Sequence, residues 1–257
     1  MIHIEKGSSF KLPLPDTKGL SIEFQWIDAD SFTMGCPEES VNFIPTVTNQ
    51  ILVKFSTGFW IGRYPVTVAQ WNSLFPVKTD DATINLHKPK TNVSWFESME
   101  FCHSINRIYA TSLPENMQFR LPTEAEWEYC LRGNSPSNDG YKMDYLDSIA
   151  WYAGNSNGLQ DVGKKAPTKW NLYDLQGNVM EWCFDSAGYT RVNTEPVDYM
   201  SFYNVSTRHV RSGAFGHEAN SFLFSDCSGD DYPKDTKLYW LGFRVCLGIA
   251  AENKEDI

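Results

Sequence analysis

Hydrophobic and polar residues alternate along two stretches in the first quarter of the chain, Ser21–Ile27 and Ile51–Phe55, and an apolar run follows at Phe59–Ile61. Alternation with a period of two is typical of a strand with one buried face, and short apolar runs between polar segments are also common in strands. We therefore predict a strand in each of the three segments.

Three further segments carry start signals for helices. Thr67 precedes the segment VAQWNSLF, Ser94 is followed three residues later by Glu97, and Thr123 is followed by Glu126. The last two pairs are capping boxes, in which each side chain accepts a hydrogen bond from the other residue's backbone N–H. The apolar positions expected on the buried face of the second helix are Phe101, Cys102, Ile105 and Ile108.

The second half of the chain has a different pattern. Gly133 is a stop signal directly after Arg132, and from there Gly, Asn, Asp and Pro recur every few residues. We expect no later helix of more than about two turns, only short strands and long loops whose aromatic content favours packed, functional loops. No repeat or linker divides the chain, so we predict one domain over residues 1–257, with a tail at 249–257.

Composition and charge narrow the class of protein. Hydrophobic residues make up 42% of the 257 residues, enough for a large core, and the net charge is −10 without any basic run, so no nucleic-acid partner is expected. No apolar stretch reaches the roughly 18 residues of a membrane span, and the start MIHIEKGSSF resembles neither a signal peptide nor a lipidation motif. We expect a water-soluble chain with no transmembrane segment, any export signal or lipid anchor lying outside it.

The six cysteines, at positions 36, 102, 130, 183, 227 and 246, form no C-x-x-C pair. Their spacing excludes zinc-finger and thioredoxin-type sites. Cys102, Cys130 and Cys246 lie in periodic apolar segments, which favours buried thiols that pack as small hydrophobic groups. The even count leaves disulfides, and with them an oxidising compartment, open.

Familiar catalytic motifs such as the P-loop, the nucleophile elbow and H-E-x-x-H are missing, and the most informative stretch is NLYDLQGNVMEWCFD at 171–185. Asp174 and Glu181 flank a Gly177-Asn178 turn that can aim both carboxylates and the carbonyls between them at one calcium ion. Two solvated carboxylates beside a turn explain the same residues, and the residues alone leave both interpretations open.

A family resemblance rests on several motifs in a shared order. They are FTMGCP, FWIGRYPVTVAQW, VSWFESMEFC, RLPTEAEWEYCLRG, AWYAGNS, VGKKAPTKWNLYDLQGNVMEW, RHVRSGAF and LGFRV. From about residue 22 to 248 the chain resembles the formylglycine-generating enzyme, or sulfatase-modifying factor, family. The resemblance implies an α+β, C-type-lectin-like fold with few helices, short antiparallel strands and long packed loops. Framework residues expected to be buried, with the arginines paired, are Arg120, Trp127, Trp182, Gly242 and Arg244.

The same resemblance predicts which chemistry is lost. Oxidase members of the family hold copper and oxidise a substrate cysteine with two cysteines that here correspond to His217 and Phe222. Cys227 matches a further, non-catalytic family cysteine. We therefore expect no copper and no enzyme activity of this type. The family's structural calcium corresponds to a ligand set made of Asp174, Gly177, Val179 and Glu181.

The segment between Gly213 and Leu241 mixes aromatic and small polar residues without periodicity, a composition shared with antibody binding loops. It resembles the variable region of proteins diversified by retroelements, which use the same fold. In them, mutation at template adenines, mostly in Asn codons, reaches Phe, His, Ser, Asp, Gly and Tyr. The predicted ligand-binding residues are Phe215, His217, Ser221, Phe222, Phe224, Asp226, Ser228, Asp230, Asp231, Tyr232 and Tyr239, with Trp240 as a fixed contact. Core packing is the competing explanation for each aromatic residue taken singly.

We predict a non-enzymatic, receptor- or adhesin-like protein that displays this variable face to an unknown protein or surface ligand. The expected location is the cell surface or outside the cell, with the cytoplasm as the alternative, and the expected state is a monomer. Two alternative functions remain: an enzyme of the family with other chemistry, and a calcium-dependent carbohydrate lectin, for which Glu195-Pro196-Val197 is a partial match to the sugar-binding tripeptide.

Overall fold

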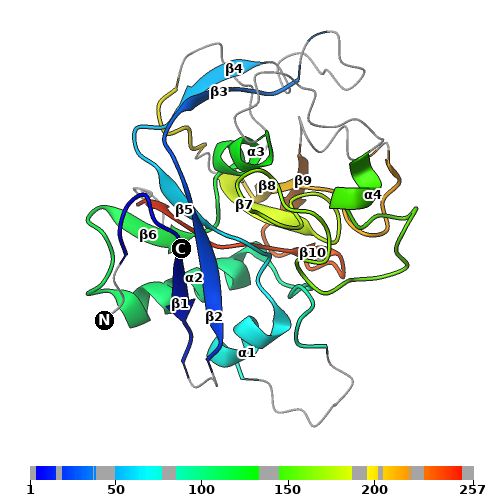
Figure 1. Cartoon of the computed structure of the whole chain (residues 1–257), viewed down its shortest axis with the longest axis horizontal. Helices are drawn as coiled ribbons and strands as arrows, with labels where there is room; N and C mark the ends of the chain where they lie inside the picture. Colours follow the sequence, from blue (N-terminus) through cyan, green and yellow to red (C-terminus); the bar gives the residue numbers. More distant parts are fainter. Residues whose placement is uncertain are drawn as a thin grey trace.

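A computed structural model describes residues 4–15, 19–36, 38, 50–76, 85–132, 145–186, 196–201, 205–219, 221 and 229–250. Within these residues the fold is α+β, as predicted, with few helices and short strands (Figure 1). Three sheets form the frame. The five-stranded sheet contains, in order, β1 (Phe10–Pro13), β2 (Ser21–Ile27), β5 (Phe59–Gly62), β11 (Cys246–Ile249) and β6 (Met117–Arg120). The four-stranded sheet contains β10 (Leu241–Gly242), β7 (Met180–Ser186), β8 (Thr207–Arg211) and β9 (Asp230–Pro233), and β3 (Ser31–Met34) pairs with β4 (Ile51–Lys54).

The three strands predicted from the pattern are present as β2, β4 and β5. Along β2, Ile22 and Phe24 are buried between half-exposed residues, as alternation requires. All four residues of β5 are buried: Trp60 packs in one hydrophobic cluster, and Phe59 and Ile61 pack in a second. A strand covered on both faces is expected to be apolar throughout, and this explains the run at these positions.

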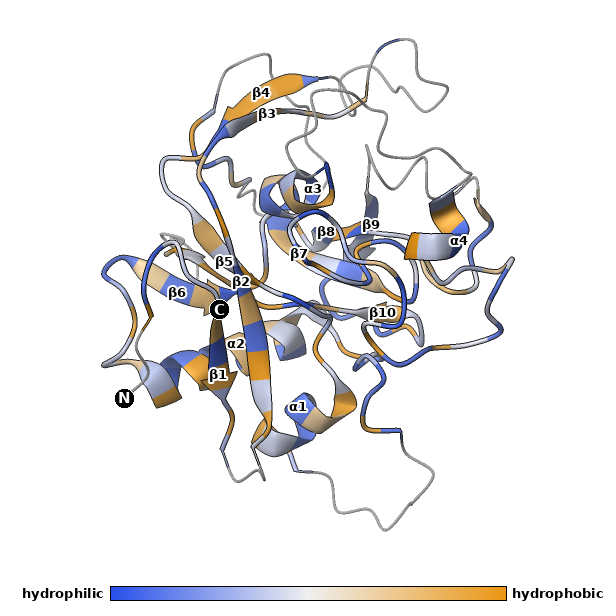
Figure 2. Ribbon diagram, in the orientation of Figure 1, coloured by the Kyte–Doolittle hydropathy of each residue, from blue (hydrophilic) through white to orange (hydrophobic). Residues whose placement is uncertain are grey.

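The helices cover the two faces of the frame. α1 (Val68–Leu74) and α2 (Trp95–Tyr109) contribute to the cluster that contains Trp60, whereas α3 (Glu124–Arg132) contributes to the second cluster. Figure 1 shows α3 beside β7 and β8, in agreement with their contacts. Bands of hydrophobic and hydrophilic residues alternate along α2 in Figure 2. A fourth, short helix, α4 (Leu146–Ile149), lies in the loop-rich second half.

The capping predictions are confirmed. Thr67 and Ser94 each form a full capping box, the second with Glu97. Thr123 Oγ1 accepts from the Glu126 N–H (3.1 Å) and the Thr123 N–H donates to the Glu126 carboxylate (2.8 Å).

Two details differ from the sequence prediction. Ile108 is 46% exposed, whereas Phe101, Cys102 and Ile105 of the same predicted face are fully buried. The paired strand β1 lies before residue 22, where the family-like motifs begin, and β11 includes Ile249, the first residue of the predicted tail. The stop residue Gly133 and residues 251–257 of the predicted tail lie outside the described residues.

Candidate functional site

The described part of the predicted binding face comes from two loops and β9. Tyr239 and Trp240 end the loop before β10 and are 57% and 38% exposed. The ring of Tyr239 lies 5.8 Å from that of Phe215, nearly perpendicular to it, so the loop before β10 contacts the loop after β8. Phe215 is half-buried, and its N–H donates to the Asn178 carbonyl (3.1 Å). An aromatic pair with one exposed member is a suitable contact surface for a ligand.

A group of polar side chains combines the loop after β8 with β9. Asp230 is exposed, while His217 and Tyr232 are half-buried. Burial lowers the pKa of His217 and raises that of Asp230, and each group opposes the shift of the other through their charges. Burial and the Asp230 charge together raise the pKa of Tyr232, whose ring also packs 6.5 Å from that of Trp182. The sequence therefore identified three residues that the fold brings together from two segments.

Asp231 has a role the sequence did not reveal. Its Oδ1 lies 2.8 Å from Nδ1 of His209 on β8, and the other ring nitrogen of His209 lies 3.7 Å from the buried Glu124 carboxylate. These carboxylates raise the pKa of His209 even though burial, the largest single influence, lowers it. Asp231 thus ties β9 to the buried charge network under the sheet.

The remaining candidates are less constrained. Ser221 is exposed, and its N–H donates to the Glu218 carbonyl (3.0 Å). Sequence reasoning missed Phe96, which is 48% exposed on the first turn of α2 and lies 5.9 Å from Nζ of Lys234 in the loop that carries Tyr239. An aromatic residue beside a capping box, outside the apolar periodicity of the helix, was the available signal. Four predicted residues lie outside the described part of the chain: Phe222, Phe224, Asp226 and Ser228.

The framework beneath the face is buried and paired, as predicted. Arg120, Trp127, Trp182 and Arg244 are fully buried, and Gly242 is buried as well. Gly242 approaches the backbone so closely that a Cβ there would lie 2.7 Å from the Lys90 carbonyl oxygen. The glycine is therefore required by packing.

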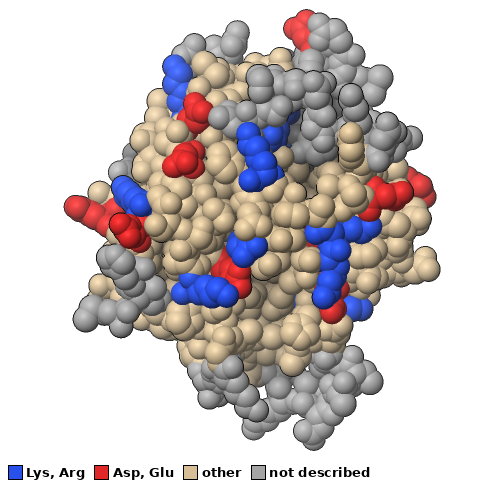
Figure 3. All heavy atoms as spheres, viewed as in Figure 1, with Lys and Arg blue, Asp and Glu red and all other residues tan. Residues whose placement is uncertain are grey.

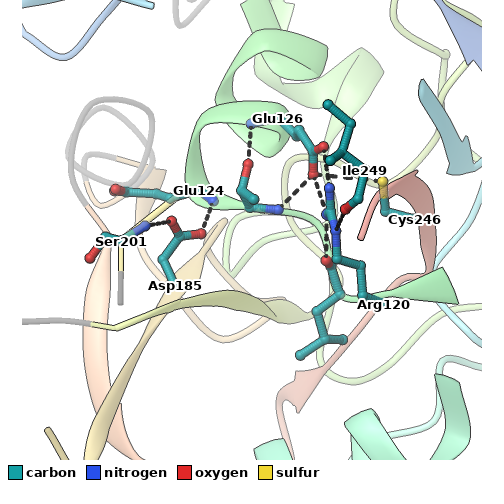
Figure 4. Close-up of polar contacts among 9 residues, drawn as sticks. Arg120, Glu124, Glu126, Asp185, Ser201, Cys246 and Ile249 are labelled. Carbon is teal, nitrogen blue, oxygen red and sulfur yellow. Dashed lines mark hydrogen bonds and ion pairs between the residues drawn. The ribbon is translucent and has the colours of Figure 1, made fainter. Parts of the chain in front are cut away.

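Figure 4 shows the charge network at the start of α3. Arg120 makes two hydrogen bonds to the Glu126 carboxylate (2.7 and 2.8 Å) and donates to the Ile249 carbonyl (3.0 Å), which joins β6, α3 and β11. Asp185 accepts from the N–H groups of Glu124 (2.6 Å) and Ser201 (2.9 Å), and burial raises its pKa to about 6. The network fixes the helix to both sheets.

The predicted turn at Gly177-Asn178 is present, with positive φ values of 76° and 62°. A Cβ on Gly177 would lie 2.3 Å from the Trp151 carbonyl oxygen, which explains the glycine. The turn does not assemble a calcium cage, however. The Glu181 carboxylate accepts two hydrogen bonds from Arg244 (2.6 and 2.7 Å) and one from Trp127 Nε1 (2.9 Å).

The other predicted ligands fit calcium no better. The Gly177 carbonyl accepts from the Val179 N–H (2.8 Å), and Oδ2 of Asp174 accepts from the Gly163 N–H (2.7 Å). Among the described residues, no group of three or more His, Cys, Asp and Glu side chains could hold a metal ion. The residues as arranged do not fit calcium, whose site stays a prediction of the resemblance.

Cys102, Cys130, Cys183 and Cys246 are free and fully buried, and burial raises the pKa of each thiol. The expectation that Cys102, Cys130 and Cys246 pack as buried hydrophobic groups is thereby confirmed. Cys36 is disulfide-bonded, which answers for this residue the question that the sequence left open.

The fold combines short, mostly antiparallel strands with two principal helices and packed loops, and buried arginines are paired at its centre. These features define a C-type-lectin-like protein of the formylglycine-generating type. The family model for the sulfatase-modifying factor enzyme 1-like domain matches residues 10–249. The chain belongs to this family, over a region that begins earlier than the sequence motifs indicated.

Curated relatives are distant. The chain is 28% identical over 174 residues to a chaperone protein LppX of Paenibacillus barcinonensis, covering 49% of this chain and 62% of that protein. It is 27% identical over 137 residues to the mouse formylglycine-generating enzyme, covering 47% of this chain and 33% of the enzyme. The chain thus spans less than two thirds of the length of either relative.

Solved structures agree with the fold. Variable protein 1 of Treponema denticola superposes with a TM-score of 0.74 at 20% identity, covering 93% of this chain and 98% of that protein. PvdO of Pseudomonas aeruginosa superposes with a TM-score of 0.75 at 22% identity, covering 95% of this chain and 99% of that one. At such identities the likeness is one of fold.

Within the described residues, no helix combines the length and apolar character needed to cross a membrane.

Proposed function

We propose that the protein is a non-enzymatic ligand-binding protein of this family, whose C-terminal segment forms a variable binding face. The observation that carries the proposal is the exposed pair Tyr239 and Trp240, with Phe215 packed against Tyr239, on loops held by a fully buried framework. Aromatic side chains give large contact area at low entropic cost, and adaptable polar neighbours supply hydrogen bonds. Such a surface is expected to bind a protein or another surface ligand.

The side chains available argue against the family's oxidase chemistry. Copper-dependent oxidation of a cysteine requires thiolates at the site, and His217 stands at one of the two corresponding positions. The four free cysteines of the described chain are fully buried, and their raised pKa values oppose thiolate formation at neutral pH. None of them replaces the missing pair.

The variable character of the face rests on two supports. The fold is shared with a protein that is named a variable protein, at a TM-score of 0.74. Most candidate positions also hold residues that adenine mutation of an Asn codon can reach. Display at the cell surface or outside the cell, as a monomer, belongs to the same proposal.

Three measurements test the proposal. First, the genomic DNA around the gene is sequenced; we expect a near-identical repeat of the 213–241 coding segment that differs at adenines, close to a reverse transcriptase gene. A gene without such a repeat contradicts the variable face.

Second, the protein is incubated aerobically with copper and a cysteine-containing peptide. Formation of a formylglycine product would overturn the non-enzymatic assignment. Third, light scattering during size-exclusion chromatography is expected to give the 29.3 kDa of the monomer.

The lectin alternative is separated by a glycan array probed with and without a chelator. Binding that chelation abolishes would favour the lectin, whereas the proposal predicts binding that does not depend on calcium, because Arg244 pairs with the Glu181 carboxylate.

The surface in Figure 3 mixes acidic and basic side chains on the face shown, without a broad basic area.

A further inference from the structure

His209 lies on β8 at an irregular point of the four-stranded sheet. On one side, the pairing of β7 with β8 shifts in register, so that residues 183–185 of β7 stand opposite His209 alone. One of these three, Cys183, is a fully buried thiol whose pKa is raised by burial, and it is uncharged at neutral pH. On the other side, His209 stands directly opposite Asp231 of β9. Side chains directly opposite each other on neighbouring strands are close enough to interact.

A carboxylate lies at each nitrogen of the His209 ring. Oδ1 of Asp231 is 2.8 Å from Nδ1, and Oε2 of Glu124, at the start of α3, is 3.7 Å from Nε2. A neutral imidazole carries a single N–H and presents a lone pair at its other nitrogen, so it attracts one of these carboxylates and repels the other. The protonated ring carries an N–H at both nitrogens. The geometry therefore favours the charged form of His209.

The other charges around the ring act mostly in the same direction. Asp185 of β7 adds a third carboxylate. Burial, the largest single influence, lowers the pKa of His209, but the three carboxylates together raise it above the ordinary value of 6.5. The cation that shares Glu124 with His209 is Arg211, which lies 3.3 Å from this carboxylate and 2.8 Å from that of Glu128. Its charge is therefore divided between two partners.

The strand that His209 contacts through Asp231 lies at an edge. Within the described residues, β9 is the outer strand of its sheet and pairs with β8 alone. Only Tyr232 of its four residues is half-buried, with its ring 6.5 Å from that of Trp182. Just beyond β9, the Lys234 N–H donates to the Ser206 carbonyl (2.9 Å). A short, exposed edge strand is a segment that opens locally at low cost in free energy, so one buried ion pair can decide how firmly it is held.

We propose that His209 is a pH-sensitive clamp for β9, in which the protonated ring holds Asp231 and Glu124 together and loss of the proton loosens the strand. Because the pKa is raised in the folded protein, the stabilisation is fully present below pH 6.5 and is lost as the pH rises through the raised value. Asp230 and Tyr232 of the proposed binding face lie on β9. Ligand binding is therefore expected to be stronger below this transition than above it, a consequence that rests on the proposed function.

Two measurements on the full chain need no ligand, so they test the clamp independently of the proposed function. NMR titration of the histidine Cε1–H signals gives the pKa of His209, whose signal is identified by its absence from His209→Gln. We expect a value above 6.5 in the wild type and a lower value in Asp231→Asn. Hydrogen exchange of the peptide that covers β9, compared with an unstructured chain between pH 6.5 and 8.5, gives its protection. We expect protection to fall with pH in the wild type, by about tenfold if Asp231 raises the pKa by one.

The controls separate this clamp from other titrating groups. Asp235→Asn changes the same charge on an exposed residue of the following loop and should keep the wild-type transition. Burial lowers the pKa of His217, which interacts with Asp230 on β9, so that its titration lies below 6.5 and outside the range measured. Asp231 is exposed, so Asp231→Asn is expected to fold even if His209→Gln does not. A pKa of His209 at or below 6.5, protection that does not change with pH, or the same change in Asp231→Asn as in the wild type would overturn the proposal.

Discussion

The buried ion pair of Glu181 and Arg244 gives the sharpest prediction of stability. Both side chains are fully buried, and three hydrogen bonds of 2.6–2.9 Å end on the Glu181 carboxylate, two from Arg244 and one from Trp127. Arg244 also donates to the carbonyls of Gly62 and Tyr173, both at 3.0 Å. Removing one partner leaves the other charge buried and uncompensated, which costs about 3–5 kcal/mol.

We therefore expect Glu181→Leu and Arg244→Met each to lower the free energy of unfolding by about 3–5 kcal/mol. For a chain of this size, that lowers the melting temperature by roughly 6–20 °C. The double variant should lose less than the sum by at least about 2 kcal/mol, because it removes both charges together. It will still be less stable than the wild type, since the Trp127 N–H and two carbonyls lose their partners.

Urea unfolding followed by tryptophan fluorescence measures the four members of this cycle. Additivity within about 0.5 kcal/mol would show that the two residues do not interact, and would refute the argument.

The same variants test whether Glu181 binds calcium. Because Arg244 occupies the Glu181 carboxylate, we expect the same wild-type melting temperature in chelator and in millimolar calcium. A rise with calcium that Glu181→Leu abolishes would instead make Glu181 a cation ligand.

Three further predictions concern the face, a helix cap and pH. Replacing Tyr239 and Asp230 by alanine should change the free energy of unfolding by less than about 1 kcal/mol in total, since both are exposed, whereas Trp182→Ala should cost about 3–5 kcal/mol. If thermal melting shows that the double variant loses as much stability as Trp182→Ala, Tyr239 and Asp230 belong to the core. Ser94→Ala removes the capping oxygen of α2 and should cost about 0.5–2 kcal/mol in urea unfolding, and an unchanged midpoint would contradict the capping box. Burial raises the pKa of Asp174 from 3.8 to about 6 in the folded state, so between these pH values the folded chain keeps a proton that the unfolded chain releases. The contribution of this residue to stability is therefore present below about pH 4 and is lost as the pH rises to about 6. Asp174→Asn should remove that loss, and identical pH profiles of wild type and variant would exclude it.

The sequence predicted what depends on neighbouring residues. Capping boxes are visible because Ser94 and Glu97 lie one helical turn apart, and the strand at Phe59 is visible as an apolar run. The family resemblance extended this local information to the framework of Trp182 and Arg244. The motifs that carry the resemblance begin only at about residue 22, whereas the family match begins at residue 10, with β1, which is short and carries little pattern.

What the sequence could not give was pairing over distance. The partner of Glu181 is 63 residues away, and Asp231 is held by His209 from the neighbouring strand. A glutamate that follows a Gly-Asn turn has the same sequence pattern whether its carboxylate faces a cation or an arginine, so the sequence could not distinguish the predicted calcium ligand from the observed ion pair of Glu181 and Arg244. Half-buried aromatics such as Phe215 were ambiguous for a similar reason, because partial burial depends on which loop packs against them.

The position of β11 has a consequence for biosynthesis. This strand, residues Cys246–Ile249, lies between β5 and β6 inside the five-stranded sheet, so β6 cannot pair with the rest of the sheet until the ribosome has released the end of the domain. A premature stop codon or frameshift in the segment 213–241 removes this interior strand as well. Truncated or misread copies then fail to fold and are open to proteolysis, while single-residue changes on the face leave the strand intact. Folding of the domain therefore depends on an intact reading frame through the last strand, and folded protein reports that the frame is intact.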